Sequence, residues 1–124
     1  MKKISLTKLD EFFAAVAASQ NLYLPVDGAK GAEYSLWTEG TVMSKAYNTL
    51  RSAKDFFFPQ VETLAAFKVN GKNIEVEDVR KETEDFVVFG VRACDAKSFE
   101  ILDSVYLADP VDSYYASRRE HGVI

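Results

Sequence analysis

The sequence predicts an α/β fold in which a mixed sheet carries helices on its faces, with an α+β arrangement as the alternative. Apolar residues recur at three- and four-residue steps over residues 5–19, which is typical of an amphipathic helix. Residues 86–91 are apolar on both faces, as expected of a central strand that is covered on each side. Asn70-Gly71 lies between two strand-like segments and suits a tight hairpin turn.

Length and composition limit the class of protein. The 124 residues have room for about one domain, so we expect a single domain over residues 1–124. Lys and Arg total 15 against 19 Asp and Glu, which disfavours binding of nucleic acid, since phosphate recognition needs a basic face. No window approaches the ~20 apolar residues of a membrane span, and charge interrupts the N-terminus before a secretory apolar run develops. These features predict a cytoplasmic protein with no membrane partner.

The N-terminal part is predicted to contain the first helix and two strands. Ser5 or Thr7 is the expected N-cap of the helix. A strand over residues 21–26 follows, and Pro25 should place it at a sheet edge because proline has no N–H to donate. Alternating apolar and polar side chains predict a half-buried strand over residues 33–38.

The middle of the chain is predicted to be irregular before it forms the hairpin. A short helix is expected over residues 45–52, followed by the apolar segment 56–59. Three consecutive phenylalanines cannot all face one way, so at least one must enter a pocket in a neighbouring layer or subunit. Residues 63–69 and 72–79 are expected to form the hairpin, at an edge of the sheet.

The C-terminal part is predicted to contain two helices. The first covers residues 95–107, and its inner stripe is expected to hold Phe99, Leu102, Val105 and Tyr106. The second runs over residues 112–120, with Gly122 as its C-terminal stop. The next two residues begin a further strand, from which we expect the sequence to be part of a longer chain. A frayed natural terminus is the alternative interpretation.

The loop between the central strand and the helix that follows it is a candidate ligand site. Free N–H groups at such a loop favour anions, and Arg92 can clamp a phosphate or carboxylate. Cys94 lies at the helix start, where a thiolate is favoured. Asp95 is placed to cap its own helix, however, so a structural turn with an Arg92 ion pair is the alternative interpretation. His121, the one histidine of the sequence, is distant from Cys94 in sequence, so a catalytic pair of Cys94 and His121 is not expected. One cysteine cannot by itself hold zinc or an iron–sulfur cluster, so no metal site is predicted within this chain.

The last helix is a candidate partner surface. Tyr114 and Arg118 are four residues apart, as are Tyr115 and Arg119, so each pair can stack on a helix. Tyrosine and arginine are enriched at interface hot spots. A solvated helix face with ordinary side-chain pairing is the alternative.

Four ordered blocks then resemble a known family. They are KDFFFPQVETL (54–64), FGVRACDAK (89–97), ILD (101–103) and DSYYASRRE (112–120). Their order and spacing are similar to the N-terminal region of the 4Fe-4S dicluster electron-transfer proteins, typified by the electron-transfer component of anaerobic sulfite reductase and the beta component of sulfhydrogenases. The match covers residues 50–124; residues 1–49 resemble the family only loosely. Ala93 stands where the family usually has proline.

The resemblance implies that the chain is the N-terminal fragment of a longer iron–sulfur protein. The cluster-binding cysteines of the family lie beyond this region, so 4Fe-4S clusters are expected in a C-terminal ferredoxin-like domain. That domain would relay electrons between two partners in an anaerobic organism. One partner would use flavin or NAD(P)H, and the other would be a hydrogenase or sulfite reductase subunit. The present region would be non-catalytic and offer contact surface. The expected contact residues are Phe58, Pro59, Gln60, Tyr114, Tyr115, Arg118 and Arg119.

Two other functions remain open from the sequence. The first is a small-molecule binding domain that holds an anion or nucleotide with Arg92, Cys94 and Asp95. The second is a thiol enzyme centred on Cys94.

Overall fold

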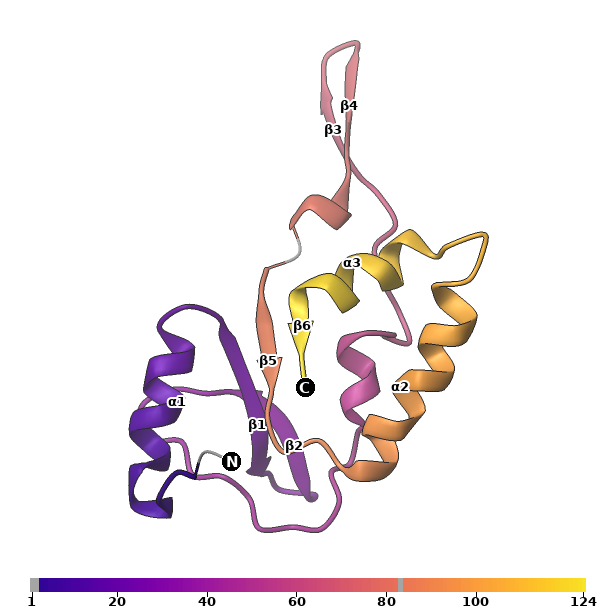
Figure 1. Ribbon diagram of the computed structural model, residues 1–124. Coiled ribbons are helices and arrows are strands. Elements are labelled where there is room, and N and C mark those ends of the chain that lie inside the picture. The colour runs from indigo at the N-terminus through magenta and orange to yellow at the C-terminus, as the bar shows by residue number, and fades with distance from the viewer. Residues whose placement is uncertain (1–2, 83) are drawn as a thin grey trace.

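The computed structural model describes residues 3–82 and 84–124 and has the α/β architecture that the sequence predicts (Figure 1). Its main sheet has the strand order β2-β1-β5-β6. The strands are β1 (Asn21–Asp27), β2 (Ala32–Leu36), β5 (Phe86–Val88) and β6 (Gly122–Val123). β1 pairs antiparallel with β2 and parallel with β5, and β5 pairs parallel with β6, so the sheet is mixed.

Helices cover both faces of this sheet (Figure 1). They are α1 (Leu9–Ala17), α2 (Ala93–Tyr106) and α3 (Ser113–His121). Phe13 of α1 packs with Leu22 and Leu24 of β1 on one face. On the other face Phe86 and Val88 of β5 pack with α2, α3 and the short 3-10 helix η2 (Ala53–Phe56). Alternate strand residues thus point into two separate cores, as the pleat requires.

The prediction that Pro25 marks an edge strand is wrong, because β1 lies between β2 and β5. The last residue of β1 that pairs with β5 is Tyr23, opposite Val88, so Pro25 lies beyond the end of β5. On that side the Pro25 carbonyl accepts a hydrogen bond from the Ser44 amide at 2.7 Å. The missing N–H of proline therefore costs the sheet no ladder hydrogen bond.

The helix expected over residues 45–52 does not form. Ser44, which is buried, donates its hydroxyl to Asp27. Thr49 forms an isolated bridge with Ala32, and the Leu50 amide donates to the Ala32 carbonyl at 2.8 Å. These contacts hold the segment in an extended path along the sheet, which outweighs its weak helix propensity. The helical turn η2 follows, and the next residue, Phe57, is fully buried and fills the predicted pocket.

The hairpin is confirmed, but its place in the fold and its turn differ from the prediction. β3 (Ala66–Asn70) and β4 (Asn73–Glu77) pair only with each other, as a separate two-stranded sheet. Asn70 pairs with Asn73, so the turn residues are Gly71 and Lys72, one position later than expected. Gly71 takes the positive φ, at 63°, that this turn needs. The hairpin projects away from the main sheet (Figure 1).

The predicted helices are confirmed with small changes. Ser5 is the N-terminal cap, although the first turn, η1 (Leu6–Lys8), is a 3-10 helix. Val105 is 59% exposed and does not belong to the inner stripe of α2, because it lies about 120° around the helix from Phe99. Gly122 ends α3 as predicted, but in an extended conformation rather than a left-handed one. A Cβ at this position would lie 2.3 Å from the Phe57 ring, so glycine is needed for close packing.

Candidate functional site

The strand-to-helix loop turns sharply at Gly90, after β5. The Phe89 amide donates to the Tyr23 carbonyl at 2.8 Å, which extends the contact of this segment with β1. Gly90 has φ 80°, and a Cβ there would approach the Pro25 ring at 3.3 Å, so the position favours glycine on both grounds. A shallow hollow opens over the loop. It is lined by Asn48, Gly90, Val91, Arg92, Ala93 and Cys94.

Arg92 is the N-cap residue of α2, and no side-chain hydrogen bond caps this helix end. Its guanidinium lies 5.5 Å from the centre of the exposed Tyr47 ring, which is a cation–π contact. No ion pair involves Arg92 within residues 3–82 and 84–124, so the ion pair of the alternative interpretation is not formed there. Arg92 therefore lies at the start of the 14-residue helix α2 and lines the hollow.

Asp95 does not cap its own helix, contrary to the prediction. Its carboxylate accepts a hydrogen bond from the Lys54 ammonium at 2.5 Å, which ties α2 to η2. Burial raises the pKa of Asp95, but the hydrogen bonds from Lys54 and Ser52 outweigh it and leave this pKa below its usual value. Asp95 is thus a structural anion that joins α2 to η2.

Cys94 is an exposed free thiol. His121 lies at the end of α3, where its Nδ1 is 2.7 Å from the Asp85 carboxylate. In the part of the chain that the structure describes, no group of three or more His, Cys, Asp or Glu side chains is arranged to hold a metal ion. Cys94 and His121 are not brought together as a nucleophile and its base.

Two of the predicted contact residues on α3 point into the core instead of toward a partner. Tyr115 is 1% exposed and donates its hydroxyl to Asp103 of α2 at 2.6 Å. Arg119 donates to both oxygens of the same carboxylate, at 2.8 and 2.9 Å, and its guanidinium lies over the rings of Phe57 and Phe99. The hydrogen bonds from Arg119 lower the pKa of Asp103, while burial and Asp103 raise the pKa of Tyr115. This cluster joins α3 to α2.

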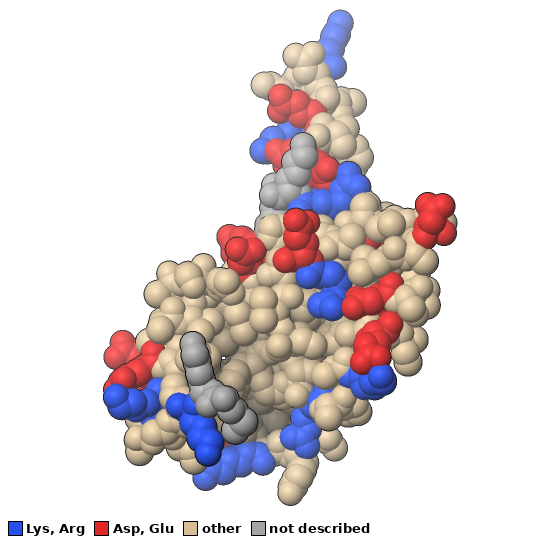
Figure 2. All heavy atoms as spheres, viewed as in Figure 1, with Lys and Arg blue, Asp and Glu red and all other residues tan. Residues whose placement is uncertain are grey.

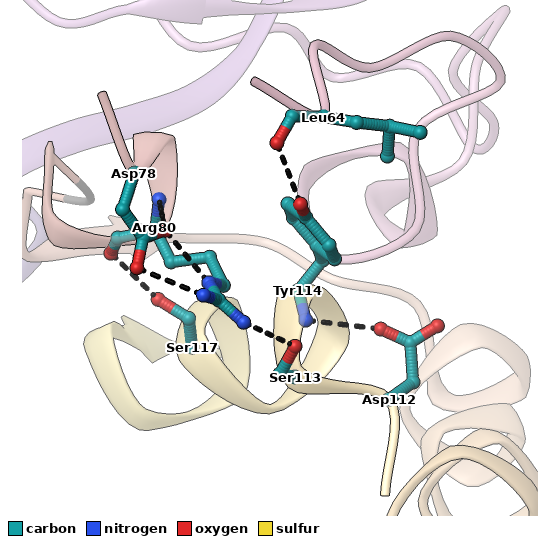
Figure 3. A network of polar contacts seen from close by, with 7 residues as sticks. All are labelled: Leu64, Asp78, Arg80, Asp112, Ser113, Tyr114 and Ser117. Atoms are coloured by element: carbon teal, nitrogen blue, oxygen red, sulfur yellow. Dashed lines mark hydrogen bonds and ion pairs between the residues drawn. The ribbon is translucent and has the colours of Figure 1, made fainter. Parts of the chain in front are cut away.

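Tyr114 and Arg118 contact other segments of the chain rather than stacking on each other. Figure 3 shows the contacts of Tyr114. The Tyr114 hydroxyl donates to the Leu64 carbonyl at 2.6 Å, and the Arg80 guanidinium lies 5.3 Å from the centre of its ring. Arg118 donates to the Phe57 carbonyl at 2.9 Å and pairs with Glu62. The predicted stacking partners are therefore wrong: each α3 residue faces another segment.

Figure 3 shows that the start of α3 clamps the segment after β4 as well. The Arg80 guanidinium pairs with Asp78 and donates to the Ser113 hydroxyl at 2.8 Å. The Ser117 hydroxyl donates to the Arg80 carbonyl at 3.1 Å. Asp112 caps α3 by accepting from the Tyr114 and Tyr115 amides at 3.0 Å each. We call these contacts the hairpin clamp. It consists of Ser113, Tyr114 and Ser117 of α3 and of their partners Leu64 and Arg80 on either side of the hairpin.

The remaining predicted contact residues follow η2. The Phe58 ring is 40% exposed and packs against Tyr106 of α2, with 4.6 Å between ring centres. Pro59 is half-buried and Gln60 is exposed. A role for these three residues in binding a partner stays a prediction.

The hairpin carries a surface that the sequence reasoning missed. Its four apolar side chains point to one face and are 63 to 70% exposed: Phe67, Val69, Ile74 and Val76. Phe67 lies opposite Val76, and Val69 opposite Ile74. The other face is polar and includes the Lys68–Glu77 ion pair. Figure 2 shows the hairpin standing out from the rest of the molecule. The signal in the sequence is the period-two alternation of both strands, which fits an edge of the main sheet equally well.

No helix among the described residues is long and apolar enough to cross a membrane. No protein-family model matches the chain, and no solved structure shows significant similarity to it. Among curated proteins the chain is similar to the sulfhydrogenase 2 subunit beta of Pyrococcus furiosus, with 35% identity over 115 residues. The alignment covers 92% of this chain but only 33% of that protein, so the chain spans about a third of the length of its relative. Nearly all of this chain is thus similar to one part of a sulfhydrogenase subunit beta.

Proposed function

We propose that the chain is a non-catalytic part of an iron–sulfur electron-transfer subunit that works in a hydrogenase or anaerobic sulfite reductase complex in the cytoplasm. The observation that carries the proposal is the 35% identity to a sulfhydrogenase beta subunit over 92% of the chain. The four ordered blocks of residues 50–124 support the same family.

The redox centres are proposed to lie in another part of the polypeptide. A 4Fe-4S cluster takes several cysteine thiolates, and this chain offers one, Cys94, with no cluster of metal ligands around it in the described residues. Our proposal therefore assigns no electron-transfer step to these residues. Their role is to support a C-terminal ferredoxin-like domain and to help dock two partners, one that uses flavin or NAD(P)H and one of the hydrogenase or sulfite reductase type.

The complete gene product, purified without oxygen, tests the proposal. We expect iron and acid-labile sulfide in the purified protein and an EPR signal of a reduced 4Fe-4S cluster after dithionite treatment. Cys94→Ala is the matched control, and it should leave the iron content unchanged. A complete product that is free of iron, and that does not copurify with hydrogenase or sulfite reductase subunits from its own cells, would contradict the proposal.

A second candidate function is the binding of a small anion at the strand-to-helix loop by Arg92, Cys94 and Asp95. It is favoured by the N-terminus of α2, which has no side-chain cap at its N-cap residue Arg92, while Asp95 binds Lys54. Since uncapped N–H groups and the helix dipole attract anions, the Arg92 guanidinium can complete such a site. Asp95 would then act indirectly, by holding α2 against η2.

A thermal-shift titration with inorganic phosphate, flavin mononucleotide and NAD tests the second candidate. We expect a rise in Tm that depends on ligand concentration and is lost in Arg92→Ala. Lys97→Ala removes one positive charge from the exposed side of the same helix and should keep the rise. If all three compounds leave Tm unchanged, the loop is a structural turn.

A further inference from the structure

The apolar face of the hairpin has the composition of a permanent interface. Phe67, Val69, Ile74 and Val76 form two directly opposed cross-strand pairs, and no charged side chain of the two strands stands among them. Interfaces between partners that separate and rejoin are about as polar as ordinary surface, whereas obligate interfaces resemble the interior of a domain. The face therefore fits a partner that stays in place.

The hairpin also lacks support of its own. Its strands pair only with each other, and an isolated two-stranded ribbon is marginally stable in water. Within the described residues the hairpin is held at its base, by the hairpin clamp, while its apolar face receives no cover. The clamp sets the direction in which the ribbon projects, which reduces the entropy lost when a partner covers it.

The greater length of the similar protein indicates which surface covers the apolar face of the hairpin. A relative that is similar over 92% of this chain is about three times as long, so about two thirds of its length lies outside the matched region. If such a further part of the same polypeptide covers the apolar face of the hairpin, the two surfaces are always present together, as an obligate interface requires.

We infer that the apolar face of the hairpin packs against the remainder of the same, longer polypeptide and fastens the present region to the cluster-bearing part. This inference rests on the proposed function and extends it, because it names the surface through which the two parts are joined. Residues outside the present region should supply an apolar patch that covers Phe67 and Ile74.

Photo-crosslinking of the complete gene product tests the inference directly. A photoreactive benzophenone amino acid replaces Phe67 on the apolar face, and a matched protein carries it at Glu75 on the polar face. We expect the label at position 67, and not at 75, to crosslink within one polypeptide to residues outside the present region. A crosslink to a second copy or to a different protein of the complex overturns the inference, as does the absence of any crosslink.

Hydrogen exchange gives an independent measurement on the same protein. In the complete gene product the amides of β3 and β4 should exchange at least tenfold more slowly than in the double variant Phe67→Ser/Ile74→Ser. The control variant Asn70→Ser/Asn73→Ser, at the end of the hairpin, should keep the protection. Equal exchange in the parent and in Phe67→Ser/Ile74→Ser overturns the inference.

The failures of the two proposals are distinguishable. An iron-loaded product whose label at position 67 crosslinks elsewhere, or not at all, overturns the docking inference alone. A longer product that shows the expected crosslink, but is free of iron and does not copurify with hydrogenase or sulfite reductase subunits, overturns the proposed electron-transfer function alone. A gene that encodes nothing beyond the present region overturns both.

Discussion

Phe57 and Phe67 show how differently two regions of this molecule use the same side chain. Phe57 is 0% exposed, in contact with aromatic rings of β5 and α2. Phe67 is 63% exposed on a ribbon that touches the rest of the chain at its base. The first phenylalanine stabilises the fold that is present, while the second contributes little until something covers it. Exposed apolar surface of this kind marks a contact site.

The largest expected effect is that of Phe57→Ala. Removing a buried phenylalanine leaves a cavity among rings that cannot close around it, so the free energy of unfolding should fall by about 3–5 kcal/mol. Phe67→Ala should change it by less than about 0.5 kcal/mol, as is usual for an exposed position. Urea unfolding of both variants measures the difference. Similar losses in the two variants would contradict the contrast between the regions.

Asp103→Ala should have the second largest effect. The substitution leaves the buried Tyr115 hydroxyl and the Arg119 guanidinium without their shared acceptor. An unsatisfied buried donor costs about 1–3 kcal/mol, and we expect a loss of that size in urea unfolding. Lys97→Ala, which removes an exposed ion pair on the same helix, should cost less than about 0.5 kcal/mol.

The same carboxylate should make stability depend on pH. The pKa of Asp103 is lowered in the folded state by the hydrogen bonds from Arg119, so its contribution is complete above the unfolded pKa of about 3.9 and is lost as the pH falls through the lower, folded value. Asp95, whose pKa is also lowered, acts in the same direction. Thermal unfolding between pH 7 and pH 2 should show Tm falling below about pH 4. In Asp103→Asn this fall should be smaller, and an unchanged pH profile would exclude the role of Asp103.

Tyr114→Phe is expected to have a smaller effect than Phe57→Ala or Asp103→Ala and to act on the hairpin clamp. It removes the 2.6 Å hydrogen bond to the Leu64 carbonyl but keeps the ring beside Arg80. The free energy of unfolding should fall by about 0.5–1.5 kcal/mol. Hydrogen exchange should become faster in the segment before β3 while the sheet core stays protected. Faster exchange in β1 or β5 would show that the clamp supports the whole fold.

The sequence predicted the elements whose signals are local. Three features could be predicted because each depends on neighbouring residues: the apolar run at the centre of the sheet, the spacing of apolar residues along the helices, and the glycine of the hairpin turn. The position of β1 was not, because the tolerance for Pro25 depends on where β5 ends. The segment around Ser44 was mispredicted for a similar reason: its path is set by hydrogen bonds to distant parts of β1 and β2.

The candidate site was predicted less well than the fold. Tyrosine and arginine in α3 suggested an interface, but the same residue types also build a buried cluster, as Tyr115 and Arg119 do with Asp103. Spacing along one helix cannot show whether Tyr114 stacks on Arg118 or meets Arg80 from another segment. The exposed hairpin face was visible as alternation, but only the tertiary structure shows that nothing within the described residues packs on it.

The strand order β2-β1-β5-β6 has a consequence for biosynthesis. On the ribosome, β1 and β2 can pair early because they adjoin in sequence, whereas the parallel partners of the sheet emerge much later. The hairpin, whose pairing is local, is translated before β5, α2 and α3. A nascent chain therefore exposes the apolar residues of the ribbon, before α3 can hold its base, beside a sheet edge that still lacks its parallel partner, and this combination favours aggregation.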